Sequence, residues 1–458
     1  MDIVLSGVCM KEYDFVFVYE GKNRELESVC LMACELEQRG YSVKILQTWK
    51  SMFWKNRAVV ARVTIGHALY STKTLHYIMS FVRECQKFVN MQWEQVFTNG
   101  DKEYDVTAQS SSVGVSGSAC EACHFSWGSE TNKRLTSLYN VSEKKTRVIG
   151  NVSLDFLLPQ FDEFYMKREE LCKRYDFPRN KKICLFISSF SYSGLPNSIL
   201  NSDLYQNQSM DVDEFVTISV NSQKYVLNWF ERFLEQNDEY IVVYRPHPAE
   251  NDNIRLKQME RKYTNFYVIS ELSIKQWIKC TEKIFTWYST AALEVYAAGK
   301  KCSILRPVDI PYKMDIELYN NGNYLKTYEQ FEAVLLGEKE CSIPIENIKR
   351  LCYINTSEPA YIRACNYLEE IYHNEIYNMN LVYEEDWSLV HRIKYNICGL
   401  VKKRKIILKI LRKLFPKKFS DSRFNGCLYN LKMYKNNYAT RGEIKRLKIK
   451  IKNCIKNR

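Results

Sequence analysis

The chain has 458 residues, of which 46% are hydrophobic, and this is enough to fill the cores of two domains of ordinary size. The net charge of +13 is uneven: residues 401–458 hold 20 Lys and Arg against two acids, so this segment carries +18 and the remainder −5. This distribution excludes a uniformly basic nucleic-acid-binding protein. No run of about eighteen apolar residues is present, so we expect no transmembrane helix.

The 16 cysteines form no regular framework, which is typical of reduced thiols in a cytosol. Residues 1–7 lack the basic and apolar regions of a signal peptide, so we expect a cytoplasmic protein. Cys120, Cys123 and His124 have the spacing of a c-type haem attachment site, but such attachment takes place outside the cytosol. A zinc site is not expected either, because no second Cys or His pair stands at a suitable distance.

The first elements along the chain predict a doubly wound domain. Residues 15–19 are an apolar run typical of a buried strand, a helical pattern follows to Gly40, and residues 41–46 form the next apolar run. Together they make a βαβ unit. Glu20 directly follows the first strand, and Glu94 follows a later apolar strand, so each places a carboxylate at a strand end.

A second domain is predicted after a charged helix at 160–177, which we interpret as the link between domains. Residues 182–187 form its first buried strand, and Ser188 and Ser189 begin the loop that follows. Small hydroxyl residues at the end of a strand can approach a phosphate closely. The polar segment 195–210 is interpreted as an insertion or a mobile loop.

The stretch 240–301 carries the strongest motifs. A strand at 240–244 ends in Arg245-Pro246-His247-Pro248, whose two prolines hold the chain extended around the histidine. The imidazole is thereby held in one place, which suits a group that meets a phosphate or a leaving oxygen. A stiff loop with a structural histidine is the alternative interpretation.

A second strand, at 283–287, leads to Ser289-Thr290 and a helix of two to three turns that stops at Gly299. The free N–H groups at the start of such a helix suit a phosphate, although Ser-Thr is also a common helix cap. Because ligands of open α/β sheets bind at the carboxyl ends of strands, we expect both motifs to face one crevice.

The pairs His247-Pro248 and Ser289-Thr290, in this order and spacing, resemble bacterial surface-carbohydrate glycosyltransferases of the capsule and lipopolysaccharide type, which have the GT-B fold. That broader group includes sialyl- and Kdo-transferases and the CDP-glycerol glycerophosphotransferases. The strand end at Glu20 and the Gln-Trp-Glu segment at Glu94 also look like this family. Val152 and Ser153 depart from it, because Pro and Arg are usual after Gly-Asn; Arg147 or Arg245 could take over the role of that Arg.

The resemblance implies an α/β, GT-B-like fold with two doubly wound Rossmann-like domains that face a cleft. We expect an acceptor-side domain at 1–158, a linker helix at 159–180, a nucleotide-donor domain at 181–390 and a basic amphipathic tail at 391–458.

The resemblance also implies transfer of a sugar from a nucleotide-activated donor, which is a substrate and not a cofactor, to a growing surface glycan or lipid-linked acceptor. The implied catalytic residues are His247 with a base, Glu94 or Glu20, and His124 is expected to face the sugar. The implied donor-binding residues are Arg245, Ser188, Ser189, Ser289, Thr290 and Glu294. No Asp-x-Asp motif stands at a suitable strand end, so no obligatory metal and no cofactor are expected.

The basic tail lies outside the resemblance. Ile407, Ile410, Leu411 and Leu414 recur at helical spacing between Lys and Arg residues, a pattern that favours a helix lying on an anionic membrane surface. Each basic side chain near such a surface contributes about 1 kcal/mol, so we expect peripheral association with the inner face of the membrane. An RNA-binding tail and a solvated charged end are the alternatives, and no nucleic-acid partner is expected.

Two other functions stay open at this point. One is a glycerol-phosphate or ribitol-phosphate transferase that uses a CDP-activated donor on the same fold. The other is a catalytically silent scaffold that recruits assembly enzymes to the membrane through its tail.

Overall fold

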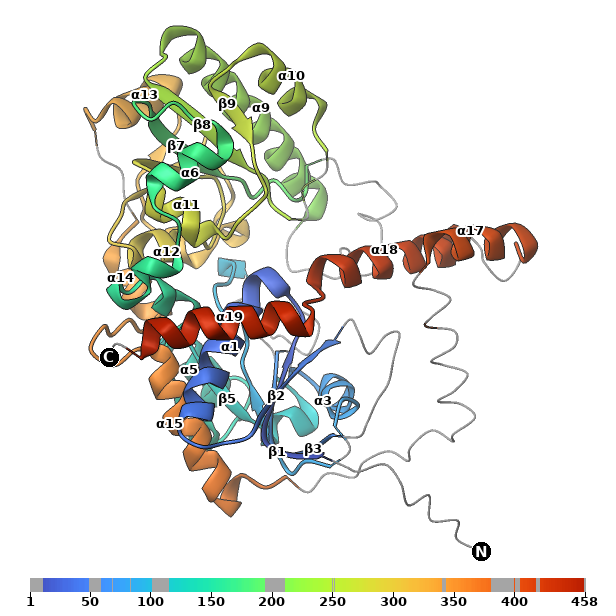
Figure 1. The fold of residues 1–458 in the computed structure, drawn as a ribbon. Helices are drawn as coiled ribbons and strands as arrows, with labels where there is room; N and C mark the ends of the chain where they lie inside the picture. The colour runs from blue at the N-terminus through green and yellow to red at the C-terminus, as the bar shows by residue number, and fades with distance from the viewer. Residues whose placement is uncertain are drawn as a thin grey trace, which may run out of the picture. The chain divides into compact units, whose positions relative to one another are not determined.

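The structure, a computed structural model, describes residues 11–48, 59–67, 69–82, 84–100, 115–193, 211–248, 250, 252–339, 343–379, 399, 404–416 and 421–456 (Figure 1). The chain forms two compact units. Unit 1 contains residues 1–94, 115–153 and 357–458, and unit 2 contains residues 95–114 and 154–356.

Unit 1 is built on a six-stranded sheet in the order β2-β1-β3-β4-β5-β6, and every pairing is parallel. Its strands are β1 (Lys11–Tyr19), β2 (Val43–Gln47), β3 (Val59–Gly66), β4 (Lys87–Asn90), β5 (Cys123–Ser126) and β6 (Thr146–Val148). Because β3 pairs with β1 on the side opposite to β2, the winding of the chain reverses between β1 and β3. In sheets of this order the reversal marks the ligand crevice.

Unit 2 is built on a second parallel sheet of six strands, in the order β12-β11-β10-β7-β8-β9. Its strands are β7 (Lys182–Ile187), β8 (Tyr240–Arg245), β9 (Phe266–Val268), β10 (Lys283–Thr286), β11 (Cys302–Leu305) and β12 (Tyr324–Leu325). This is the dinucleotide-fold order, in which the winding reverses between the first and fourth strands. Those strands are β7 and β10.

Helices connect the strands in both units. Unit 1 contains α1 (Lys22–Gln38), α3 (Thr72–Met79), α5 (Ser129–Ser137), α15 (Ala360–His373), α17 (Lys405–Leu414), α18 (Asp421–Asn437) and α19 (Arg441–Ile455). Unit 2 contains α6 (Arg168–Tyr175), α9 (Val212–Gln236), α10 (Ile254–Lys262), α11 (Ile274–Cys280), α12 (Ala292–Ala297), α13 (Tyr328–Leu336) and α14 (Ile345–Leu351). Central strands such as β8 are buried on both faces, which explains their continuous apolar sequence.

The predicted fold class, two doubly wound α/β units with a basic helical tail, is confirmed. The predicted cleft between the units stays a prediction. The segment predicted as one linker helix contains instead a 3-10 helix at Pro159–Phe164 and then α6, because the chain is extended at Tyr165 and Lys167 between them. The polar segment 195–210 lies outside the described residues.

The end of the chain belongs to unit 1, whereas the sequence suggested boundaries at 158 and 390. Helices α15 and α19 lie alongside α1 (Figure 1). Lys452 of α19 contacts Glu37 of α1 at 3.0 Å, and Lys448 contacts the same carboxyl group. Although burial raises the pKa of Glu37, the two ammonium groups hold it below its usual value. Helix α19 is therefore part of the folded unit.

We expect Ile451→Ala in α19 to lower the free energy of unfolding by about 2–5 kcal/mol, because its side chain is fully buried. Ile449→Ala on the same helix is the matched control, since Ile449 is 51% exposed and its loss should change stability by less than about 0.5 kcal/mol. Urea unfolding of the full chain measures both. Equal effects would mean that α19 does not pack against unit 1 in solution.

Candidate functional site

Three loops at the carboxyl edge of the unit 2 sheet form the candidate donor site. They follow β8, β7 and β10, which are neighbours in the sheet. The loop after β7 is joined to the loop after β10 by a hydrogen bond from the Tyr288 N–H to Ser189 Oγ, at 2.9 Å. The winding of the chain reverses between these two strands, so the loops flank the crevice position of the fold.

A half-buried carboxyl group, Glu250, holds two of these loops together. Its Oε2 accepts from Ser188 Oγ at 2.6 Å and from the His247 N–H at 3.0 Å. Its Oε1 accepts from Tyr244 Oη at 2.7 Å and from Gln223 Nε2 at 3.0 Å. Burial raises the pKa of Glu250, and these four donors oppose that shift. The sequence analysis missed Glu250, although its place two residues after Pro248 was a signal.

His247 lies in the loop that Glu250 folds. A second hydrogen bond joins the two residues through the main chain, because the Glu250 N–H donates to the His247 carbonyl at 2.8 Å. The His247 residue itself is exposed at the carboxyl edge of the sheet. Such a side chain, on a backbone fixed by two hydrogen bonds, can meet a ligand without a large loss of conformational freedom.

Arg245 ends β8 and turns toward a neighbouring loop. Its guanidinium donates to the carbonyls of Glu271 at 2.7 Å and Leu272 at 2.5 Å. Burial lowers the pKa of Arg245 to about 10. Leu272 has a positive φ of 64°, a conformation that is costly for a branched residue, and the Arg245 bond holds it there. Arg245 therefore has a structural role, in addition to any contact with a nucleotide-activated substrate.

The Ser289-Thr290 turn leads into a shorter helix than the sequence predicts. Helix α12 has six residues and begins after Ala291, and Gly299, with φ of +69°, follows it. Ser289 Oγ accepts from the Ala291 N–H at 3.2 Å. A short helix presents a weaker positive end to a phosphate, so the hydroxyl groups of Ser289 and Thr290 carry more of the expected interaction.

Glu294 is half-buried on α12. Burial raises its pKa, and the nearby Lys275 of α11 partly opposes this shift. Lys275 is itself 4% exposed, an unusual degree of burial for a lysine. The sequence analysis did not single out Lys275, because nothing in a charged helix signals which lysine faces inward.

In unit 1, a cluster of charged side chains lies where β1 and β4 end. Arg24 contacts the carboxyl groups of Glu94 and Glu25, and its Nη2 lies 3.7 Å from Glu20. Burial lowers the pKa of Arg24, but the three carboxylates outweigh it and raise the pKa above its usual value. The structure therefore brings together Glu20 and Glu94, which the sequence analysis named as two alternative bases.

His67 belongs to the same cluster and was missed by the sequence analysis. It directly follows β3, and its Nε2 lies 3.7 Å from Glu20 Oε2. The residue is 7% exposed, and its Nδ1 is buried without a hydrogen-bond partner in the part of the chain that the structure describes. A histidine one residue past an apolar strand was the signal that could have found it.

His124 does not face a sugar, which corrects the expectation from sequence. It is fully buried on β5, where Nε2 bonds to the Ala119 carbonyl at 2.9 Å and Nδ1 to Asn90 Nδ2 at 3.2 Å. Burial lowers the pKa of His124 to about 4, so the ring is neutral near pH 7. Both ring nitrogens are already bonded within the protein, so His124 is a structural residue.

Arg147, one of the two residues considered for the role of the Arg that is missing after Gly150-Asn151, is bonded to other side chains of unit 1. Arg147 bonds to Glu370 at 2.8 Å and to Tyr377 Oη at 3.0 Å, and both partners lie in the returning C-terminal segment. Asn151 Oδ1 accepts from the Ser153 N–H at 2.9 Å and shapes the turn itself. The contacts of Arg147 are therefore structural.

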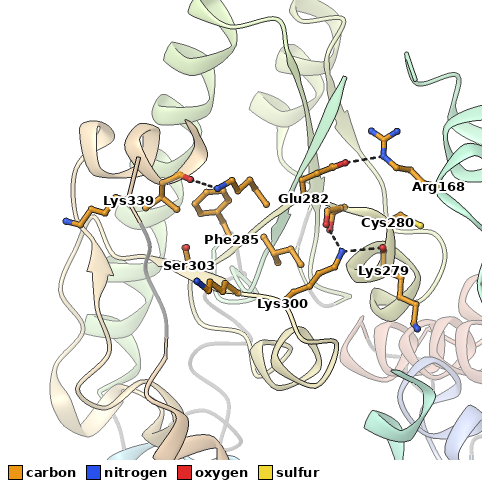
Figure 2. Close-up of a pocket in the computed structure, with 13 residues that line it drawn as sticks. Arg168, Lys279, Cys280, Glu282, Phe285, Lys300, Ser303 and Lys339 are labelled. Atoms are coloured by element: carbon orange, nitrogen blue, oxygen red, sulfur yellow. Dashed lines mark hydrogen bonds and ion pairs between the residues drawn. The ribbon is translucent and has the colours of Figure 1, made fainter. Parts of the chain in front are cut away.

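A cavity of about 500 Å³ lies at the opposite, amino edge of the unit 2 sheet (Figure 2). It is rich in Lys, and two of these amines are bonded to the ends of helices. Lys300 Nζ donates to the Ile278 carbonyl at 2.6 Å and to the Thr281 carbonyl at 2.7 Å, and Lys283 Nζ donates to Val334 at 2.9 Å. Since such amines offset the negative ends of α11 and α13, we do not assign the ligand site here.

No group of three His, Cys, Asp or Glu side chains within the described ranges is arranged to hold a metal ion. The Cys120, Cys123 and His124 motif is likewise no ligand set, since Cys123 is buried and His124 is fully bonded.

The chain matches no protein-family model and no curated protein. Among solved structures, it is similar to one named as a UDP-N-acetylglucosamine 2-epimerase from Listeria monocytogenes, with 12% identity over 83% of this chain and 100% of that chain and a TM-score of 0.48. The H548A variant of the wall teichoic acid polymerase TagF matches with 13% identity, 80% and 90% coverage and a TM-score of 0.48. The UDP-GlcNAc 2-epimerase from Neisseria meningitidis bound to UDP-GlcNAc matches with 11% identity, 79% and 99% coverage and a TM-score of 0.45. All three TM-scores are below 0.5, so the site and its chemistry rest on the residues of this chain.

We expect Glu250→Gln to destabilise the protein by about 1–3 kcal/mol, because an amide nitrogen would face donors that now bond to a carboxylate. Glu239→Gln is the matched control, since Glu239 is exposed and lies 3.9 Å from Lys182. Thermal and urea unfolding measure the difference. If both variants unfold alike, Glu250 does not organise the His247 loop.

Proposed function

We propose that the protein is a glycosyltransferase that moves a sugar from a nucleotide-activated donor to a bacterial surface polysaccharide acceptor of the capsule or lipopolysaccharide type. The observation that carries the proposal is the convergence of three loops, at Ser188-Ser189, His247 and Ser289-Thr290, on the carboxyl edge of one parallel sheet. These loops follow adjacent strands and lie beside the reversal of winding, where this order of strands binds nucleotides.

The chemistry of these groups suits departure of a nucleotide. As the bond from the sugar to the phosphate oxygen breaks, negative charge develops on the phosphate. His247 and the hydroxyl groups of Ser289 and Thr290 would stabilise that charge, because hydrogen bonds fix the backbone at His247 and at Ser289. Arg245 would add a fixed positive charge, and Glu294 would accept hydrogen bonds from the ribose hydroxyls.

The acceptor hydroxyl needs a group that takes its proton. We propose a carboxylate of the unit 1 cluster, Glu20 or Glu94, for this role, because both follow strands at the carboxyl edge of that sheet. The donor would be a substrate, and the mechanism needs no cofactor.

A CDP-polyol phosphotransferase on the same fold is the alternative enzyme. It would release CMP from CDP-glycerol or CDP-ribitol, whereas a UDP- or GDP-sugar donor would release the nucleoside diphosphate. A scaffold protein would release no nucleotide from any donor. The purified chain is therefore offered each donor separately, and turnover of a nucleotide-sugar, of CDP-glycerol or CDP-ribitol, or of no donor separates the three functions.

We expect one of CMP, CDP, UDP and GDP to raise the unfolding temperature of the wild-type protein, because a ligand that binds only the folded state stabilises it. His247→Ala should weaken that shift and lower donor turnover at least tenfold, since a preorganised donor to the phosphate is lost. Asp252→Ala serves as the control, because Asp252 is an exposed residue shortly after the same loop. Wild-type turnover in a folded His247→Ala variant would sink the assignment.

We also propose that α17 docks the protein on the inner face of an anionic membrane. The helix exposes Ile406, Ile410 and Leu414 at successive turns, and Phe415 follows. Leu408 is buried against Leu431 of α18, which holds the helix from its other side. Basic side chains stand between the apolar ones. The basic side chains can therefore pair with anionic lipid headgroups while the apolar ones contact the acyl chains at the membrane surface. No helix within the described ranges is long and apolar enough to span a membrane.

We expect the full chain to sediment with phosphatidylglycerol vesicles and not with phosphatidylcholine vesicles. The double variant Ile410→Asp with Leu414→Asp should lower the bound fraction at least tenfold, because it places two charges on the apolar face. Ile449→Asp is the matched control, an exposed isoleucine on α19. Undiminished binding by the double variant would contradict docking through α17.

A further inference from the structure

The Ser289-Thr290 turn is held by a segment of unit 2 that follows β11. The Trp287 carbonyl accepts from Arg306 Nη1 at 2.6 Å, and the Ser289 carbonyl accepts from Tyr319 Oη at 2.5 Å. The N–H group between these two carbonyls is bonded to the loop after β7. Hydrogen bonds from two separate segments therefore fix the backbone that leads into the turn.

A buried ion pair supports the segment after β11. Arg306 is 1% exposed, and its Nη2 lies 2.5 Å from Asp315 Oδ1. The guanidinium of Arg306 lies 5.2–6.0 Å from the centroids of four aromatic rings, that of Tyr319 included. Because a buried charge without its partner is strongly unfavourable, this pair ties the two ends of the segment 306–315 together.

Tyr319 is itself held in place. Its side chain is fully buried, and its carbonyl accepts from Tyr324 Oη at 2.6 Å. The next residue, Asn320, exchanges two side-chain hydrogen bonds of 2.8 Å with Asn99. The Asn99 N–H in turn donates to the Asp315 carbonyl at 2.8 Å. The hydroxyl group of Tyr319 therefore reaches the turn from a fixed backbone.

The bond from Tyr319 also determines the direction of an N–H group of the turn. The Ser289 carbonyl and the Thr290 N–H belong to one planar peptide group, which is trans, since the described residues contain no cis peptide bond. The two groups point in opposite directions, so a hydrogen bond that fixes the carbonyl fixes the N–H as well. The Ser289 hydroxyl is joined to the same backbone through a single rotatable bond, so the backbone also sets its reach.

We propose that Tyr319 is a positioning residue for the phosphate of the nucleotide-activated donor. Its bond to the Ser289 carbonyl sets how the turn presents the Thr290 N–H and the Ser289 hydroxyl to that phosphate. The inference rests on the proposed function and extends it by a residue that acts through Ser289, without contact with the donor. Such a residue changes the affinity for the nucleotide, because a turn that is not fixed in advance loses conformational freedom on binding.

Tyr319→Phe removes the hydrogen bond and keeps the ring. The variant should fold, because the Ala292 N–H also donates to the Ser289 carbonyl, at 3.3 Å. We expect the Kd of the full chain for whichever of CMP, CDP, UDP and GDP stabilises the wild type to rise at least fivefold. The kcat/KM for the donor that carries this nucleotide should fall by at least the same factor. Calorimetric titration below the unfolding temperatures of both proteins measures the Kd.

Tyr240→Phe is the matched control. Tyr240 is 3% exposed and its Oη donates to the Leu335 carbonyl at 2.9 Å, so this variant loses the same kind of bond. Tyr240 lies at the start of β8, at the opposite edge of the same sheet, and the variant should change the Kd less than twofold. Equal weakening in both variants, or a wild-type Kd in Tyr319→Phe, would overturn the inference.

Amide hydrogen exchange tests the support of the turn without any nucleotide. Peptides that cover residues 287–291 should exchange at least tenfold faster in Tyr319→Phe than in the wild type, because a bond that keeps the turn closed is lost. The same peptides should exchange at the wild-type rate in Tyr240→Phe. Unchanged exchange in Tyr319→Phe would overturn the inference alone. A wild-type protein that binds none of the four nucleotides and turns over no donor would overturn the proposed function, and with it the role toward a phosphate.

Discussion

Every strand pairing in the two six-stranded sheets is parallel, and the arrangement of the candidate sites depends on this constraint. The carboxyl ends of parallel strands lie at one edge of the sheet. The residues that follow each strand therefore gather at that edge, whatever their separation in sequence. In unit 2 the edge collects Ser188, His247 and Ser289 from three adjacent strands. In unit 1 it collects Glu20 and His67 beside the reversal of winding.

A hydrogen-bonded glutamate shapes the loops in each unit. Glu250 accepts the His247 N–H in unit 2, and Glu25 accepts the Glu20 N–H in unit 1. Hydrogen bonds to an ionised group contribute about 1.5–3 kcal/mol each, more than neutral ones, and they lose their strength quickly with distance. A loop held in this way keeps its exposed neighbour in one place, and a side chain that meets a reacting group needs such a fixed backbone.

The basic tail divides into parts with different tasks. Helix α19 buries Ile451 and pairs its lysines with Glu37, so its charge is balanced within unit 1. Helix α17 shows Ile406, Ile410 and Leu414 to solvent among basic residues with few acids nearby in sequence. Net charge alone could not separate them, because both helices are rich in Lys and Arg. The difference lies in which apolar side chains the fold covers.

The sequence by itself determined the longer strands of both units, since buried parallel strands are continuous apolar runs, and it placed Glu20, His247 and Ser289 at strand ends. It also located the apolar and basic pattern of α17. The tertiary structure alone decided that Glu250 folds the His247 loop, that His67 faces Glu20, and that both ring nitrogens of His124 are bonded inside the core. These facts depend on pairings between residues distant in the chain, and periodicity reports only which face of an element is apolar, not which partner lies opposite.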